Sequence, residues 1–151
     1  MRPVEVSETF TGSVAEAQRC WHEARGWPRW VEGCERVLAV DARWPEVGSG
    51  VTWESGPAGR GRVTERVVAF EPLRGLTVEV SDASIRGRQM VAFIPDDGEV
   101  TVELALAYRL EHRSIVSPLV DRLFIRRAMA ASLGSTLRRF GVELQAARRG
   151  R

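Results

Sequence analysis

The chain has 151 residues, of which 44% are hydrophobic and 28% charged, so it is neither disordered nor fibrous and fits one globular domain. All 22 basic residues are arginine, against 20 acidic residues, and the absence of lysine excludes a Schiff-base lysine and a P-loop. Two cysteines make no disulfide framework, and the first residues contain no apolar signal core. We therefore expect a single domain over residues 1–151, located in the cytoplasm.

The first predicted element is a half-buried strand over residues 4–10, where apolar and polar side chains alternate. Ser13-Val14-Ala15-Glu16 then forms a capping box, which predicts the start of a helix that Gly26 ends. The turn Trp27-Pro28-Arg29-Trp30 follows, with its proline suited to the start of one helical turn. One or two short helices are therefore expected after the first strand.

Strands separated by turn residues are predicted for the middle of the chain. Their expected ranges are 35–42, 51–55, 62–70, 76–81, 88–94 and 100–110. The strongest turn signal is Pro95-Asp96-Asp97-Gly98, because proline presets φ, aspartate bonds locally and glycine accepts a positive φ. Turns this short join antiparallel neighbours, since a parallel crossover needs about a dozen residues. The pattern predicts an antiparallel meander.

A long helix is predicted from Ser117, with Pro118 at its first position, to about Ala147. Apolar residues recur along one stripe of this helix, and small residues occupy the middle of the stripe. Small side chains there either let the helix approach the sheet closely or leave room for a ligand.

The last third of the chain is basic. Residues 109–151 hold 10 arginines and 3 acidic residues, whereas residues 1–108 hold 12 arginines and 17 acidic residues. A basic segment can bind nucleic acid or anionic lipid, but these arginines are scattered around the helix with few aromatic neighbours. That distribution favours a solvated helix face, so no nucleic-acid partner is expected. Peripheral membrane contact stays open, and no uncharged run is long enough to cross a bilayer.

The order of these elements resembles the START-like (SRPBCC) superfamily. The resemblance rests on the capped first helix, the Trp27–Trp30 turn, the segment from Val68 to Leu76 and the arginine-rich terminal helix. Within the superfamily, residues 3–147 most resemble polyketide cyclase/dehydrase and lipid-transport proteins. The resemblance implies an α+β helix-grip fold, a curved antiparallel sheet of six or seven strands wrapped around the C-terminal helix. It also implies that a cavity between sheet and helix holds an apolar or aromatic small molecule; no cofactor is expected.

Residues on the inward faces are candidates for the wall of this cavity. The apolar candidates are Trp53, Leu104, Leu106, Tyr108, Ala130 and Gly134. Small-molecule sites are mainly apolar pockets with a few polar groups, although the same side chains would also simply fill a core. A position at the cavity mouth is one interpretation of the glycine-containing loop from Gly56 to Gly61.

Two charged residues interrupt the apolar faces, Glu8 on the first strand and Arg126 on the last helix. A buried charge is costly unless it is paired, so an inward Arg126 requires a carboxylate, from Glu8 or from a ligand. The alternatives are that Arg126 extends its head to water and that Glu8 lies at a strand end near solvent.

Three functional hypotheses follow. The first is a carrier or sensor that binds a hydrophobic or aromatic small molecule, lipid or polyketide-like. The second is a polyketide cyclase, aromatase or dehydratase whose catalytic residues remain unknown; the candidates for acid/base or anion-binding groups are Tyr108, Glu8, Arg126 and His112. The third is a module that docks a protein or a membrane. With two histidines and two cysteines, no metal site is expected. Ligand identity and oligomeric state are left open.

Overall fold

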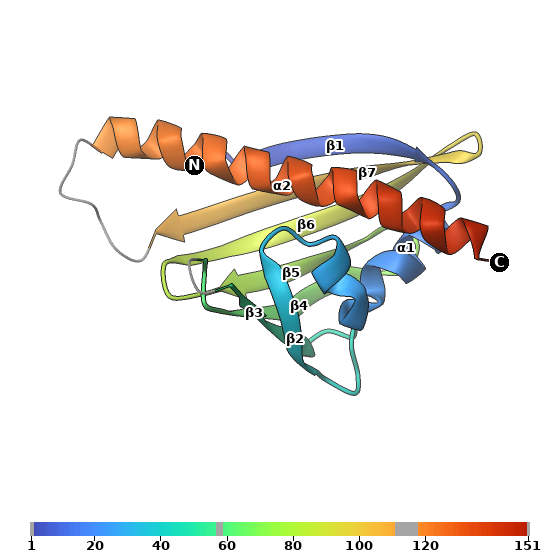
Figure 1. Ribbon diagram of the computed structural model, residues 1–151, viewed down its shortest axis with the longest axis horizontal. Coiled ribbons are helices and arrows are strands. Elements are labelled where there is room, and N and C mark those ends of the chain that lie inside the picture. The colour runs from blue at the N-terminus through green and yellow to red at the C-terminus, as the bar shows by residue number, and fades with distance from the viewer. Residues whose placement is uncertain (1, 57–58, 111–117, 151) are drawn as a thin grey trace.

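The computed structural model describes residues 2–56, 59–110 and 118–150, and within them a seven-stranded antiparallel sheet carries a long helix across it (Figure 1). The strand order is β1-β7-β6-β5-β4-β3-β2, so β2 to β7 form a meander and β1 joins at β7. The predicted helix-grip fold is therefore confirmed. The elements are β1 (Val4–Thr11), α1 (Val14–His22), the 3-10 helix η1 (Ala24–Arg29), β2 (Cys34–Val40), β3 (Gly50–Ser55), β4 (Arg62–Glu71), β5 (Gly75–Ser81), β6 (Ile85–Asp96), β7 (Glu99–Leu110) and α2 (Pro118–Arg149).

The predicted capping box is present at the start of α1. The Glu16 backbone N–H donates to the Ser13 hydroxyl at 3.1 Å, and the Ser13 N–H donates to the Glu16 carboxylate at 2.9 Å. The predicted end at Gly26 is wrong, because α1 ends at His22 and a separate 3-10 helix follows. The Trp27 indole donates to the Trp21 carbonyl at 2.9 Å, which satisfies a carbonyl of the last turn as the chain changes direction.

The strand boundaries agree with the prediction within two residues, apart from the start of β6, which lies three residues earlier than predicted. The two-residue turn between β6 and β7 explains the close pairing of these strands. Asp97 and Gly98 both have positive φ, at 43° and 82°, as in the type I′ turn that matches the twist of a hairpin. The predicted start of α2 at Ser117 lies outside the described residues, and Pro118 begins the helix.

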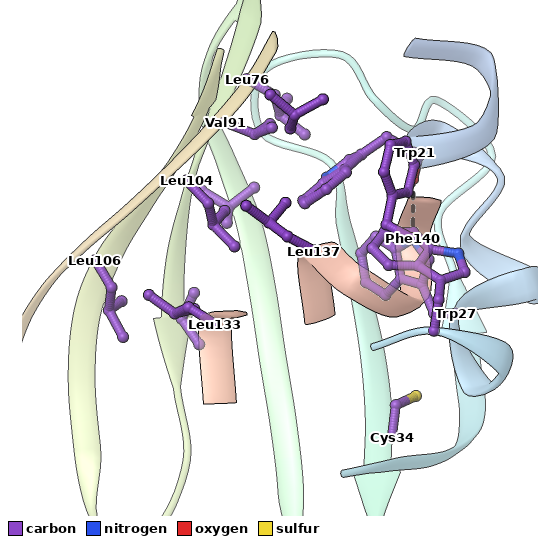
Figure 2. Packing of buried hydrophobic residues seen from close by; sticks show 14 of the residues in the cluster. Trp21, Trp27, Cys34, Leu76, Val91, Leu104, Leu106, Leu133, Leu137 and Phe140 are labelled. Atoms are coloured by element: carbon purple, nitrogen blue, oxygen red, sulfur yellow. Dashed lines mark hydrogen bonds between the residues drawn. The ribbon is translucent and has the colours of Figure 1, made fainter. Parts of the chain in front are cut away.

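The core lies between the sheet and the second half of α2. Leu133, Leu137, Phe140 and Leu144 point from α2 into it. Figure 2 shows Leu137 between Leu104 of the sheet and the aromatic rings of Trp21, Trp27 and Phe140. The predicted stripe fails before Arg126, since Leu123 is 54% exposed. Arg126 already lies beside Arg2 and Pro3, so the preceding turns extend past the beginning of β1.

Two glycines of α2 provide a matched pair for testing this packing. A Cβ on Gly141 would fall 2.7 Å from Cδ1 of Phe10, whereas a Cβ on Gly134 would meet only the Arg138 guanidinium, at 3.4 Å. Both substitutions gain about 1 kcal/mol of helix propensity, but overpacking costs about 1–3 kcal/mol. We expect Gly141→Ala to be less stable than Gly134→Ala by about 1–3 kcal/mol in urea unfolding. Equal stabilities would contradict the close contact of α2 with β1.

Candidate functional site: a tryptophan-walled pocket with a buried carboxyl

A small pocket lies between α2, the segment after α1 and the inner face of the sheet. Its volume is about 50 Å³. Four tryptophans contribute to its wall, together with Leu104 of β7 and Leu133 of α2. The tryptophans are Trp21, Trp27, Trp30 and Trp53, and the polar lining residues are Glu32, Arg60, Glu65, Gln89, Ser132 and Thr136. The pocket therefore combines aromatic walls with polar groups from several elements.

Glu65 is the buried one of the two acidic side chains that line this pocket. It lies on the inner face of β4 and is 7% exposed. Its cross-strand neighbours on either side are Val51 and Val80, so no water-facing neighbour shields its charge. The Trp53 indole N–H donates to Oε2 of Glu65 at 2.7 Å, across a diagonal of the β3–β4 pair. This hydrogen bond fixes the orientation of the carboxyl group.

The electrostatic environment favours the neutral acid form of Glu65. Burial raises the pKa of this carboxyl above its ordinary value, and the Trp53 hydrogen bond and the Arg60 charge offset only part of the effect. Arg60 lies 5.6 Å from the Trp53 ring centroid and forms an ion pair with the buried Asp82 carboxylate at 2.6 Å. Arg60 is therefore already paired, so among the residues that the structure describes Glu65 has no ion pair of its own.

A carboxyl held in this way can exchange a proton with a bound molecule. In the acid form it donates a hydrogen bond to a ligand oxygen, and in the ionised form it accepts one or removes a proton. Acidic side chains whose pKa is shifted and which line a pocket are common at functional sites. By contrast, Cys34 nearby is not a nucleophile at neutral pH, because burial and the Glu65 charge raise the pKa of its thiol to about 11.

The helical side of the pocket is held by hydrogen bonds to the segment after η1. The Glu32 backbone N–H donates to the Thr136 hydroxyl at 2.9 Å, and the Ser135 hydroxyl donates to the Glu32 carboxylate at 2.8 Å. Arg139 adds an ion pair to the same carboxylate at 3.4 Å. These contacts fasten the middle of α2 over the pocket, so a ligand larger than the pocket must displace side chains or part of this helix.

The structure distributes the sequence-predicted wall residues unequally around this pocket. Trp53 and Leu104 line it. Leu106 and Tyr108 continue the same inward face of β7 beyond it and are buried in the core. Ala130 and Gly134 lie on α2 outside the lining. Arg60, from the loop that the sequence offered as a cavity mouth, does line the pocket, and its side chain is 38% exposed.

The hypothesised pair of Arg126 and Glu8 is absent from the described structure. Arg126 donates to the Arg2 and Pro3 carbonyls at 2.7 and 3.0 Å, which satisfies its guanidinium without a carboxylate. Glu8 stands half-buried on β1, opposite Val102. His112, the other titratable candidate, lies outside the described residues.

The sequence analysis missed Glu65, although a signal for it was present. In the strand 62–71, Val63, Glu65 and Val67 share one face, and both valines are buried. The same argument that singled out Glu8 therefore also applies to Glu65. The Trp53 indole, which points along the sheet to reach the carboxyl, has no comparable sequence signal, because strand register decides which side chains meet.

His22 is a half-buried titratable group outside the pocket lining. Its ring packs against Phe70 and Trp44, at 5.2 and 6.5 Å between centroids, and Nε2 has no hydrogen-bond partner. Burial lowers the pKa of His22 from 6.5 to about 4. On acidification the unfolded chain binds this proton first, so stability is lost as the pH falls from 6.5 towards 4.

Replacing His22 should remove that acid sensitivity. We expect His22→Phe, which keeps an aromatic ring there, to lose less stability than the wild type between pH 7.5 and pH 5.5. The difference should be at most about 1 kcal/mol, because the side chain is only partly buried. Urea unfolding at both pH values measures it. Parallel pH profiles for the two proteins would show that His22 titrates normally.

The described residues show neither a metal cluster nor a membrane helix. Residues 2–56, 59–110 and 118–150 hold no group of three or more histidine, cysteine or acidic side chains arranged for a metal ion. In the same part of the chain, no helix has the length and hydropathy needed to cross a bilayer.

Comparisons with solved structures agree with this helix-grip arrangement. The Zhui aromatase/cyclase from Streptomyces sp. R1128 superposes with a TM-score of 0.79 at 15% identity, over 99% of this chain and 96% of that one. The di-domain aromatase/cyclase StfQ from the steffimycin biosynthetic pathway gives 0.75 at 16% identity, over 99% of this chain and 53% of StfQ. Norcoclaurine synthase from Thalictrum flavum gives 0.72 at 9% identity, over 97% and 96%. A comparison with curated proteins finds no match.

The long helix gripped by a curved antiparallel sheet places the protein in the helix-grip class. Residues 1–145 match the family described as polyketide cyclase / dehydrase and lipid transport. The chain belongs to this family, as the sequence resemblance implied.

Proposed function

We propose that the protein binds a small aromatic, polyketide-like molecule in the tryptophan-walled pocket, as a carrier or sensor. The observation that carries the proposal is the buried Glu65 carboxyl, hydrogen-bonded by Trp53 inside an aromatic pocket. Aromatic walls contribute apolar contact area, and a single oriented polar group selects ligands with a hydroxyl or carbonyl. Membership of a polyketide cyclase and lipid-transport family supports the same ligand class.

The pocket must widen when such a ligand binds. Its volume of about 50 Å³ is far below the roughly 300–1,000 Å³ of ordinary ligand sites. The direction of widening in this proposal is along β7, where Leu106 and Tyr108 continue the inner face towards the less buried half of α2. Ala130 and Gly134 then form the helical wall of the enlarged cavity. Both cysteines are free thiols, which supports a reducing compartment such as the cytoplasm.

A titration with 2-naphthol, an aromatic molecule with one hydroxyl, tests this proposal. Leu133→Phe enlarges a side chain of the pocket wall, whereas Leu123→Phe makes the same change at an exposed position of the same helix. We expect saturable binding to the wild type by calorimetry, at least about tenfold weaker binding to Leu133→Phe, and unchanged binding to Leu123→Phe. Absence of saturable binding, with the fold intact, would favour the third hypothesis, a docking module.

Glu65 also favours a second candidate function, an acid/base enzyme. An ionised Glu65 could take a proton from the carbon beside a ligand carbonyl and return it, which is the proton transfer that cyclisation and dehydration require. Exchange of the C1 protons of 2-tetralone for deuterium in heavy water, followed by NMR, reports this step. If the protein is an enzyme of this kind, the exchange rate should be higher with the wild type than with Glu65→Gln. Equal rates with the two proteins would favour a carrier.

A further inference from the structure

Arg60 is the only cationic side chain that lines the tryptophan-walled pocket within the described part of the chain. It belongs to the loop between β3 and β4, and hydrogen bonds close that loop at its base. The Ser55 backbone N–H donates to the Gly61 carbonyl at 2.9 Å, and the Gly61 N–H donates to the Ser55 hydroxyl at 2.7 Å. The backbone therefore holds Arg60 at a defined place beside the pocket, and the proposed function gives its charge no part.

The guanidinium of Arg60 is oriented by two neighbours. Its Nε donates to Oδ2 of Asp82 at 2.6 Å, and it lies 5.6 Å from the ring centroid of Trp53. The Asp82 carboxylate is itself fixed, because its Oδ1 accepts the backbone N–H groups of Ser84 and Ile85 at 2.7 and 2.9 Å and its side chain is only 1% exposed. A rigid carboxylate on one side and an aromatic ring on the other restrict the rotamers open to Arg60.

The two terminal nitrogens of Arg60 remain available to a ligand. A guanidinium has five N–H donors, and Asp82 uses the one on Nε. Within residues 2–56, 59–110 and 118–150, Nη1 and Nη2 form no hydrogen bond. These two nitrogens present the planar fork that matches the two oxygens of a carboxylate. Arg60 thus resembles a preorganised receptor for a carboxylate more than a completed ion pair.

The two acidic residues of the pocket lining do not compete for this fork. The Glu32 carboxylate is bound on the helical side, by the Ser135 hydroxyl at 2.8 Å and by Arg139 at 3.4 Å. Glu65 accepts the Trp53 indole N–H, and its burial favours the neutral acid. An anion at Arg60 therefore meets acidic side chains that are already paired or uncharged.

We propose that the pocket selects aromatic carboxylates and that Arg60 is the residue that binds the carboxylate group. The inference rests on the proposed function, because it names the ligand class of the same pocket. Arg60 is partly exposed, so a carboxylate bound there stays partly hydrated while the attached ring enters between the tryptophans. Its desolvation cost is then lower than that of a fully buried ion pair. Glu65 remains free to bond a hydroxyl or carbonyl elsewhere on the ligand.

Calorimetric titration with 2-naphthoate and 2-naphthamide at pH 7 tests the proposal. The two molecules have nearly the same shape and differ in charge. We expect the wild type to bind 2-naphthoate at least about tenfold more tightly than 2-naphthamide. Arg60→Gln should remove this preference and change the affinity for 2-naphthamide by less than about twofold. The control Arg62→Gln, which removes the same charge from an exposed position two residues away, should keep the preference.

A second variant guards against loss of the fold. Arg60→Gln leaves the buried Asp82 carboxylate without its ion pair, whereas Arg60→Gln/Asp82→Asn removes both charges and keeps an oxygen for the two backbone N–H groups. Circular dichroism melts verify the fold of each variant, and the double variant should also lose the preference for 2-naphthoate.

The outcomes separate this inference from the proposed function. Saturable binding of 2-naphthamide with no tighter binding of 2-naphthoate would overturn the role of Arg60 and leave the aromatic pocket standing. An equal loss of preference in Arg62→Gln would do the same, since it would show a general effect of net charge. Absence of saturable binding of either molecule would overturn both the inference and the proposed function.

Discussion

Phe140→Ala is expected to lower the free energy of unfolding by about 3–5 kcal/mol. Phe140 is fully buried in the second half of α2. Its ring contacts those of Trp30, Trp21 and Phe10, with centroids 5.0, 5.1 and 5.7 Å away. Truncation therefore removes the aromatic side chain that joins α2 to β1, α1 and the residue after η1, and leaves a cavity that the rigid tryptophans cannot fill.

A matched control for this variant exists on the same helix. Phe124 is 73% exposed, so Phe124→Ala should change stability by less than about 0.5 kcal/mol. Both values come from urea unfolding at neutral pH. If the two substitutions had similar effects, α2 would not be anchored through its second half, and the account of the pocket as a space beneath that helix would fail.

Glu65→Gln is expected to stabilise the protein at neutral and alkaline pH. Because the pKa of Glu65 is raised in the folded state, its contribution is fully present below the unfolded value of 4.5 and is lost as the pH rises through the folded value. Glutamine has a similar shape and its carbonyl can still accept the Trp53 N–H. At pH 8 we expect a gain of at least about 1 kcal/mol, or a rise in Tm of about 2–4 °C.

The pH dependence identifies the origin of that gain. The advantage of Glu65→Gln over the wild type should shrink towards zero near pH 4.5, and because His22 is present in both proteins its own titration cancels. Glu103→Gln, at an exposed position of β7, should show no such dependence. A Glu65→Gln protein less stable than the wild type at pH 8 would mean that the ionised carboxylate is well solvated or paired.

The sequence predicted the fold well because its signals are local. Turn residues such as Pro95 to Gly98 separate the strands, the Ser13 capping box marks α1, and alternation assigns the inward faces. These features depend on neighbours in sequence, and they also predicted the antiparallel meander of β2 to β7, since short turns join antiparallel neighbours. The pairing of β1 with β7 joins distant segments and had no such local signal. The apolar stripe was predicted wrongly for the first turns of α2, because those turns extend past the beginning of β1 and have no strand to pack against there.

The site could be predicted only in part. Trp53 and Leu104 were identified from alternation, and the same alternation in β4 would have identified Glu65. The Trp53–Glu65 hydrogen bond depends on the register between β3 and β4, and this register cannot be predicted from the residue pattern of either strand alone. The partner of Arg126 was left open by the sequence, because a guanidinium can also be satisfied by backbone carbonyls at the chain start.

The most direct test of the central claim is an NMR titration that follows the five tryptophan indole N–H signals as 2-naphthol is added. Trp53 donates to Glu65 within the pocket, whereas Trp44 donates to the His22 carbonyl outside it and serves as an internal control. If the pocket binds the ligand at Glu65, the Trp53 signal shifts saturably and the Trp44 signal does not move. An unmoved Trp53 signal at saturating 2-naphthol, or a shift confined to Trp44, would contradict the account.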